Sequence, residues 1–241
     1  MDLSKSDIAG SLAAGESVYL DKCHIGTRVT ELQDVIVAGT VLDGDGGVIH
    51  GNAVYGESCG LADVTYENGG AAIQASPIDF AAADTTLATF CGNVLNLPAN
   101  GEVLIDGTEM QLSGTDPDVN VFDVAAEDLA DGIWISIPVP YGATVVVRVI
   151  GIEAALRAIR IDSGVISAQT LLWSFCETGK LTIEGTKVPG SILAPNADVD
   201  VTDMMIDGTL VGGSVSGDLR TQSVPFKGCI DDRTGGPRQP S

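Results

Sequence analysis

The sequence is short of basic residues, of large aromatic side chains and of long apolar runs. Its 241 residues include 12 Lys and Arg against 33 Asp and Glu, which gives a formal net charge of −21. A charge of this sign repels polyanions, so nucleic acids and anionic membrane surfaces are disfavoured as partners. No apolar run reaches the roughly 18 residues of a membrane-spanning helix. The acidic residues are scattered, which is typical of a solvated surface, of cation binding or of adaptation to high salt.

Residue patterns for metal binding and catalysis are also scarce. The five cysteines form no CxxC pair, and His24 and His50 are the only histidines, so a zinc site is disfavoured. Asp43 and Asp45 beside the glycines of 44–47 would make half of a calcium site, but no acidic residue follows at the distance that an EF-hand loop requires. We therefore expect no enzyme activity and no resident cofactor. An Asp-Gly turn is the expected structure at 44–47, with calcium binding as the alternative.

A short pattern recurs at both ends of the chain, in which an apolar residue and any residue precede a glycine and a small polar residue. Glycine allows a corner or a close backbone approach, and the apolar residues that mostly follow favour a short strand. The copies lie at 8–13, 37–42, 49–54, 183–186, 188–191 and 206–209. Such repetition predicts a parallel β-solenoid whose N- and C-terminal coils share one stack. The alternative is an antiparallel β-sandwich with glycine-rich turns.

One segment, 76–97, has the pattern of an amphipathic helix. Ser76 is a suitable N-cap, Pro77 suits the first helical position, and Pro98 ends the helix. The apolar residues recur at three- and four-residue spacing at Phe80, Ala83, Leu87, Phe90, Cys91, Val94 and Leu95. A single apolar stripe predicts a helix that packs along the side of the stack, with Cys91 as a core residue.

The middle of the chain predicts further strands. A hairpin is expected over 102–112, and 144–150 is a β-branched run typical of a strand covered on both faces. Residues 60–75 lose this periodicity, so a loop is expected there. The arginines of the region are expected to neutralise nearby carboxylates, and they are Arg148, Arg157 and Arg160.

Stretches along the whole chain resemble the choice-of-anchor A family of bacterial surface proteins. The residues that carry the resemblance are Ile8 to Glu16, Val121-Phe122, Leu172 to Phe175, Gly190 to Ala197, Ile206 to Val211 and Pro225-Phe226. They span residues 5–228, and Gly190 to Ala197 is the most specific stretch. The family usually has asparagine where Ser174 stands, and a cysteine such as Cys176 does not usually follow. The resemblance implies a secreted adhesive domain.

The order of elements is also similar to the fold of bacterial and fungal ice-binding proteins. That fold implies a mainly β chain wound as a right-handed parallel β-solenoid, with the helix of 76–97 packed alongside. We expect a single domain over 1–228 and a flexible tail or linker over 229–241. The residues expected to shape the scaffold are Gly10, Gly39, Trp173, Phe175, Gly190, Gly208 and Phe226.

Two disulfides are expected from the places of the cysteines in this scheme. Cys176 and Cys229 each follow a family motif near the closing end of the fold, so we expect them to pair. Cys23 and Cys59 are the second expected pair. Disulfides form and persist in extracellular proteins, and the cell exterior is the location that the resemblance implies.

The expected function is that of a binding or adhesive module at the cell surface. Its partner would be a glycan, a matrix protein or another surface protein, and the sequence does not name the ligand-binding residues. A structural spacer, an ice-binding protein and a polysaccharide-active β-helical enzyme are the alternatives. Ice binding needs a regular ladder of hydroxyl side chains, and only scattered candidates exist, at Thr186, Ser191, Thr209 and Ser214.

Overall fold

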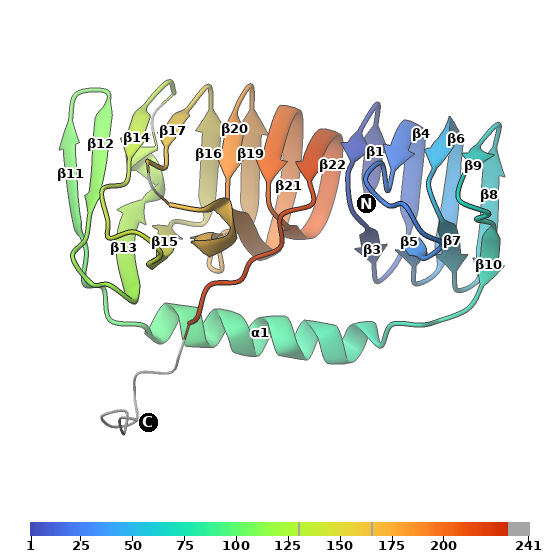
Figure 1. The fold of residues 1–241 in the computed structure, drawn as a ribbon, viewed down its shortest axis with the longest axis horizontal. Coiled ribbons are helices and arrows are strands. Elements are labelled where there is room, and N and C mark those ends of the chain that lie inside the picture. The colour runs from blue at the N-terminus through green and yellow to red at the C-terminus, as the bar shows by residue number, and fades with distance from the viewer. Residues whose placement is uncertain (130, 165, 231–241) are drawn as a thin grey trace.

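The structure is a computed structural model that describes residues 1–129, 131–164 and 166–230. Short strands lie side by side along one long axis, and a single α-helix, α1, runs beneath them (Figure 1). Among the described strands, every pairing is parallel except that of β11 with β12. The alternative of an antiparallel sandwich is therefore excluded, and the mainly β stack with one docked helix is confirmed.

Each coil of the chain places strands on three faces. Strand β21 (Ser191–Asp207) shows this most clearly, because it bends and pairs in turn with β18, β19 and β20. We call the three faces the covered face, the acidic face and the open face.

The covered face lies against α1. Its strands are β13 (Val119–Ala125), β15 (Thr144–Ile150), β18 (Leu171–Ser174), the first part of β21, the first part of β22 (Leu210–Gln222), and then β3 (Leu12–Ala14), β5 (Asp34–Ala38), β7 (Asn52–Tyr55) and β10 (Ala72–Gln74). All but the last residue of β15 are buried, so the predicted strand with both sides covered is confirmed.

The acidic face follows the covered face in each coil. Its strands are β16 (Glu153–Arg157), β19 (Lys180–Glu184), the middle of β21 and β22, β1 (Asp2–Ser4), the first half of β4 (Val18–Ile25), the first half of β6 (Val41–Ile49) and β8 (Ser58–Ala62).

The open face completes each coil. Its strands are β11 (Glu102–Asp106), β12 (Glu109–Ser113), β14 (Trp134–Ser136), β17 (Arg160–Asp162), β20 (Lys187–Pro189), the last part of β21 and β22, β2 (Asp7–Ile8), the last part of β4 and β6, and β9 (Thr65–Tyr66). Two short 3-10 helices, η1 (Ala126–Asp128) and η2 (Ala168–Thr170), lie in connections. The predicted hairpin over 102–112 is the β11–β12 pair.

The first strand of the chain, β1, lies in the middle of the stack and joins its two halves. Asp2 of β1 pairs with Ser216 of β22 on one side and with Tyr19 of β4 on the other. The expectation that the N- and C-terminal coils share one stack is therefore confirmed. No helix in the described part of the chain is long and apolar enough to cross a bilayer.

The core is built from ladders of side chains in register. On the inner side of the covered face, the ladder runs through Phe122, Val147, Trp173, Ile192 and Leu210. Trp173 is fully buried, and its indole nitrogen donates a hydrogen bond to the carbonyl oxygen of Pro189 over 3.0 Å. Phe175 is also buried, whereas Phe226 is half-buried against the side chains beneath α1.

Three of the four expected corner glycines are required by their surroundings. Gly190 has a φ of +93°, and a side chain at Gly208 would place its Cβ 2.1 Å from the carbonyl oxygen of Gly190. Likewise, a Cβ at Gly39 would lie 2.0 Å from the carbonyl oxygen of Gly15. Gly10 differs, because its nearest neighbour is the side chain of Ser223 at 3.5 Å.

Helix α1 (Phe80–Asn96) begins later than the predicted 76–97 helix. The N-cap is Asp79 and not Ser76, because the Asp79 carboxylate accepts a hydrogen bond from the backbone nitrogen of Ala82 over 3.0 Å. Cys91, Val94 and the residue that follows α1, Leu97, are buried against the outer side of the covered face. The predicted docking of the apolar stripe is thus confirmed.

A disulfide joins α1 to the stack, and it is not one of the two that the sequence predicted. Cys176 bonds to Cys91, with 5.7 Å between the Cα atoms, whereas Cys23, Cys59 and Cys229 are free. The Cys23–Cys59 prediction is wrong because β4 and β8 are separated by β6. Two strand spacings amount to about 9.6 Å, beyond the reach of a disulfide. The Cys176–Cys229 prediction is wrong because Cys176 is bonded to Cys91, which leaves Cys229 as an exposed free thiol.

Two further expectations about local structure are corrected. The glycines of 44–47 lie within β6, which bends at Gly46 (φ +67°) and Gly47 (φ +100°) while it stays paired with β4. The expected loop of 60–75 is instead a further coil, in which β8, β9 and β10 each occupy one face. The expected tail over 229–241 falls mostly on 231–241, outside the described residues.

Candidate functional site

The outer side of the open face carries two rows of side chains at the end where β12, β14 and β17 lie. The first row is Glu109, Trp134 and Arg160, and the second row is Gln111, Ser136 and Asp162. We call these six residues the Trp134 grid. Neighbouring members of a row are about 4.8 Å apart, and the two rows are about 6.6 Å apart along the strands.

Strand alternation explains why these side chains point outward. Met110, Leu112 and Ile135 occupy the alternate positions and are buried in the core. Trp134 therefore sits on the side that faces solvent, where 48% of its surface is exposed. Half of the indole surface is therefore available for contact with a ligand.

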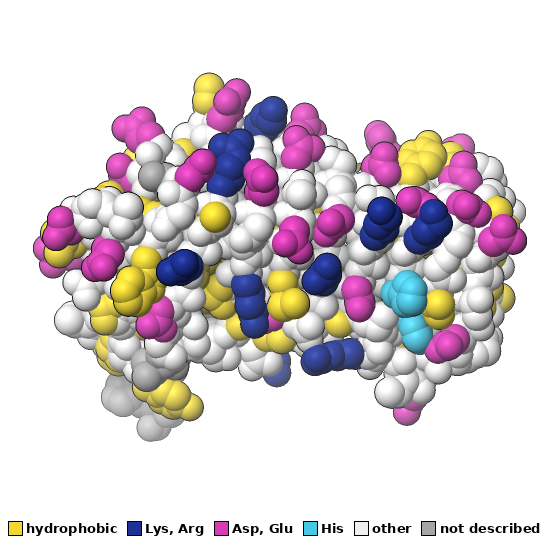
Figure 2. All heavy atoms as spheres, turned by 90° about the horizontal axis from the view of Figure 1, so that it is seen from above, with side chains coloured by type: hydrophobic (Ala, Val, Ile, Leu, Met, Phe, Trp, Pro, Cys, Tyr) yellow, Lys and Arg dark blue, Asp and Glu magenta, His cyan; other side chains and the backbone are white. Residues whose placement is uncertain are grey.

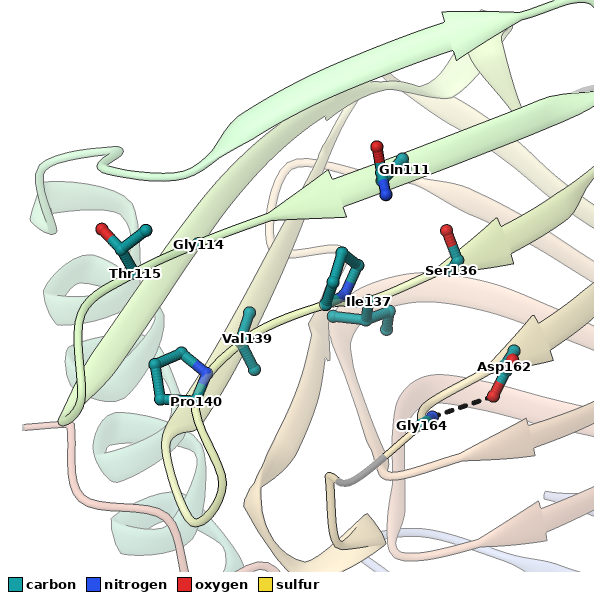
Figure 3. A pocket seen from close by; sticks show the side chains of 10 residues that line it. Gln111, Gly114, Thr115, Ser136, Ile137, Val139, Pro140, Asp162 and Gly164 are labelled. Atoms are coloured by element: carbon teal, nitrogen blue, oxygen red, sulfur yellow. Dashed lines mark hydrogen bonds between the residues drawn. The ribbon is translucent and has the colours of Figure 1, made fainter.

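A groove adjoins the second row of the grid. Strand β14 ends at Ser136, and Pro138 and Pro140 follow, which lack the N–H donors that sheet pairing requires. Segments 113–115 and 162–164 flank this proline segment, and the cavity between them has a volume of about 560 Å³. Figure 3 shows Gln111, Ser136 and Asp162 on three adjacent strands at its edge. Ile137 and Val139 are buried and supply apolar lining.

The polar groups of the grid are available for hydrogen bonding to a ligand. Asp162 uses one carboxylate oxygen to accept from the backbone nitrogen of Gly164 over 2.9 Å. The side chains of Gln111 and Ser136 make no hydrogen bond with the described residues, and Arg160 forms no ion pair with them. The expected neutralisation by arginines therefore holds for Arg148 and Arg157, and for Arg160 it stays a prediction.

Beyond the grid, the open face continues as a mixed row of charges. Strand β20 lies next to β17, and its Lys187 pairs with Asp207 at 2.8 Å, while Arg220 lies 3.9 Å from Asp203. Figure 2 shows Lys and Arg side chains along the length of the molecule, among Asp and Glu side chains. This row is therefore locally balanced despite the strongly acidic chain.

The acidic face is a less suitable binding surface, because two serine hydroxyl groups on it are already engaged. Ser214 donates to Asp198 over 2.7 Å, and Ser216 donates to Asp200 over 2.8 Å. Asp43 and Asp45 lie on the outer side of this face in β6. Among the described residues, no three His, Cys, Asp or Glu side chains are grouped to hold a metal ion. Calcium binding at Asp43 and Asp45 stays a prediction.

The other reactive side chains lie apart from the grid. His50 contacts Glu67 at 2.8 Å, and His24 is on the open face at the N-terminal end of the stack. Burial raises the pKa of the Cys23 thiol, so the reactive thiolate is disfavoured there. Residues 56–60 spell G-x-S-x-G, a pattern that sequence reasoning passed over. Ser58 begins β8 in the stack, so the strand-to-helix turn of a hydrolase nucleophile is absent.

The fold and the open face define a class, namely a stack of parallel coils that presents a broad outer surface. Residues 1–223 match a protein-family model described as "Putative Ice-binding-like adhesive domain". The chain belongs to this ice-binding-like adhesive family, because the match covers nearly all of it. The resemblance to choice-of-anchor A proteins stays a prediction.

Comparisons with individual proteins say less about this chain than the family match does. A search of the curated proteins found no match. Among solved structures, the chain is similar to an ice-binding protein from an Antarctic ascomycete, Antarctomyces psychrotrophicus, with 17% identity and a TM-score of 0.36. That similarity covers 89% of this chain and 93% of the other.

Sequence reasoning did not find the Trp134 grid, although a signal for it exists. Ile133, Ile135 and Ile137 alternate as core residues, which puts Trp134 and Ser136 on the solvent side. An aromatic residue in the polar phase of that alternation marks the position. The pairing of Trp134 with Glu109 and Arg160 could not be read from the sequence, because it depends on how coils stack.

Proposed function

We propose that the protein is an adhesive domain displayed outside the cell, which binds its partner through the open face. Its membership of the adhesive family carries this proposal. The exposed Trp134 grid supports it, because it joins an aromatic surface to uncommitted polar groups beside a groove.

Several features support an extracellular location. The Cys91–Cys176 disulfide persists in oxidising compartments such as the cell exterior. The net charge of −21 favours a soluble, well-solvated surface.

We also infer that the coil is right-handed, because parallel strands joined by a crossover connection almost always have that hand.

Binding without catalysis is the simpler use of the groove. Glycoside hydrolysis needs two carboxyl groups on either side of the scissile bond. Among the described residues that line the groove, Asp162 is the one carboxylate.

Ice binding is the second candidate, and the family description favours it. It requires a flat face of regularly spaced, uncharged small side chains. Here Lys180, Asp198 and Ser214 are neighbours on the acidic face, and the open face carries the charged row described above. These charges argue for adhesion over ice binding.

The test is a binding assay with the full chain on bacterial and host cells, on immobilised matrix proteins and on a glycan array, with thermal hysteresis measured in parallel. Saturable binding to any of these surfaces supports adhesion. Thermal hysteresis without surface binding would replace adhesion by ice binding, and the absence of both would leave a spacer role.

A further inference from the structure

We propose that the Trp134 grid is a binding site for a neutral oligosaccharide, with one pyranose ring stacked on the indole of Trp134. This inference rests on the proposed adhesive function and names its ligand class and site.

The indole supplies the apolar part of the site. A pyranose ring has a face of C–H groups and a rim of hydroxyl groups. The C–H groups are weakly positive, so they are attracted to the negative face of an aromatic ring and gain from burying apolar surface. Trp134 is 48% exposed and lies near the centre of the grid, so it is free to accept such a ring.

The neighbours of Trp134 match the hydroxyl rim. Glu109 and Arg160 flank it across the two adjacent strands, and Ser136 follows it along its own strand. Carboxylates accept hydrogen bonds from sugar hydroxyls, guanidinium groups donate them, and amide and hydroxyl groups do both. Polar groups that can pair with the rim hydroxyls therefore stand on both sides of Trp134, within one strand spacing of it.

The groove extends the site beyond one ring. It begins at the second row, where Gln111 and Asp162 stand at its edge, and its volume of about 560 Å³ exceeds what a single sugar ring fills. A chain of at least two or three sugars would thus lie from the indole into the groove.

Charge favours a neutral ligand over an acidic one. Within the grid, Glu109 and Asp162 outnumber Arg160, and the whole chain carries a net charge of −21. A uronic acid oligomer would meet net repulsion at the site and over a long range.

The test is isothermal titration calorimetry of the full chain with cellotriose, chitotriose, mannotriose and trigalacturonate. We expect at least one neutral trimer to bind, and trigalacturonate to bind at least tenfold more weakly than that trimer. Trp134→Ala should weaken binding by at least about tenfold, as expected for an aromatic anchor, and Trp134→Phe should retain most of it. Gln111→Ala should weaken binding about threefold to tenfold.

Tyr19→Ala is the matched control, because Tyr19 is an aromatic side chain with 45% exposure on the acidic face. It should leave the affinity unchanged within about twofold, and thermal unfolding checks that each variant is folded. Equal binding by Trp134→Ala and the parent chain overturns the site. Failure of all three neutral trimers overturns the ligand class. If cell or matrix binding persists in either case, the adhesive function stands, and if it is also absent, both proposals fall.

Discussion

The covered face and the open face of the same stack differ in how far their outward-pointing side chains are buried. On the covered face, Val146, Leu172 and Leu193 point out of the strands and are buried beneath α1. On the open face, outward positions carry charged and polar groups, with Trp134 among them. The outward apolar residues of the covered face are thus sealed by α1, whereas Trp134 keeps 48% of its surface open to solvent.

The two faces also differ in how firmly they are held. On the covered face, Arg148 lies under the end of α1, where it donates to the carbonyl oxygens of Leu95 and Leu97 over 2.8 and 2.7 Å and pairs with Asp123 at 2.6 Å. These carbonyls are left without partners when a helix ends, so Arg148 satisfies them and offsets the negative end of the helix dipole. We call this set of contacts the Arg148 clamp. The described residues of the open face make no such set of contacts.

The largest expected effect comes from removing this clamp. Arg148→Met should lower the free energy of unfolding by about 3 kcal/mol, because Asp123 and the helix carbonyls lose their donor within a largely buried site. Urea denaturation measures the loss. Arg157→Met is the control, since its ion pairs are exposed, and it should cost less than about 1 kcal/mol. Equal losses in the two variants would show that Arg148 is no clamp.

A comparable effect is expected from opening a cavity under the helix. Leu172→Ala should cost about 2–4 kcal/mol in urea denaturation, because Leu172 is 3% exposed between β18 and α1. A loss below about 1 kcal/mol would mean that α1 does not seal the covered face.

The disulfide should contribute a comparable amount. Replacing both members, Cys91→Ser with Cys176→Ser, should lower the free energy of unfolding by about 2–4 kcal/mol, because the bond closes a loop across 85 residues. Cys229→Ser removes an exposed, free thiol and should change stability by less than about 0.5 kcal/mol. A double variant with the same free energy of unfolding as the parent chain would contradict the stabilising role given to this bond.

The smallest effect on stability is expected on the open face. Trp134→Ala should change the free energy of unfolding by less than about 1 kcal/mol, because half of the side chain is already exposed. Urea denaturation beside Leu172→Ala makes the comparison direct. A loss as large as that of Leu172→Ala would make Trp134 a structural residue and not a binding residue.

The sequence predicts the scaffold well where local chemistry repeats. Gly190 and Gly208 reveal corners because their backbones approach each other too closely for a side chain, and the stripe of α1 reveals its buried side. The coil over 56–75 was missed because its strands have only two to five residues and lie mostly exposed at the end of the stack. Neither a clear corner motif nor a buried apolar run marks them.

Contacts between distant segments were the harder part to predict. Cys91 and Cys176 are 85 residues apart, and only the docking of α1 on β18 brings them together. The helix stripe contained part of the signal, because it places Cys91 on the side of α1 that packs against the strands. The Trp134 grid likewise joins three strands from three coils, so its register could not be derived from any one segment.

The most direct test of the central claim uses the two tryptophans, of which Trp134 is 48% exposed and Trp173 is fully buried. Acrylamide should quench the emission of Trp134 in the free protein while that of Trp173 is protected. Saturation with whichever of cellotriose, chitotriose or mannotriose binds should reduce this quenching by at least half. Quenching that stays unchanged with all three trimers would contradict a sugar-binding surface at Trp134.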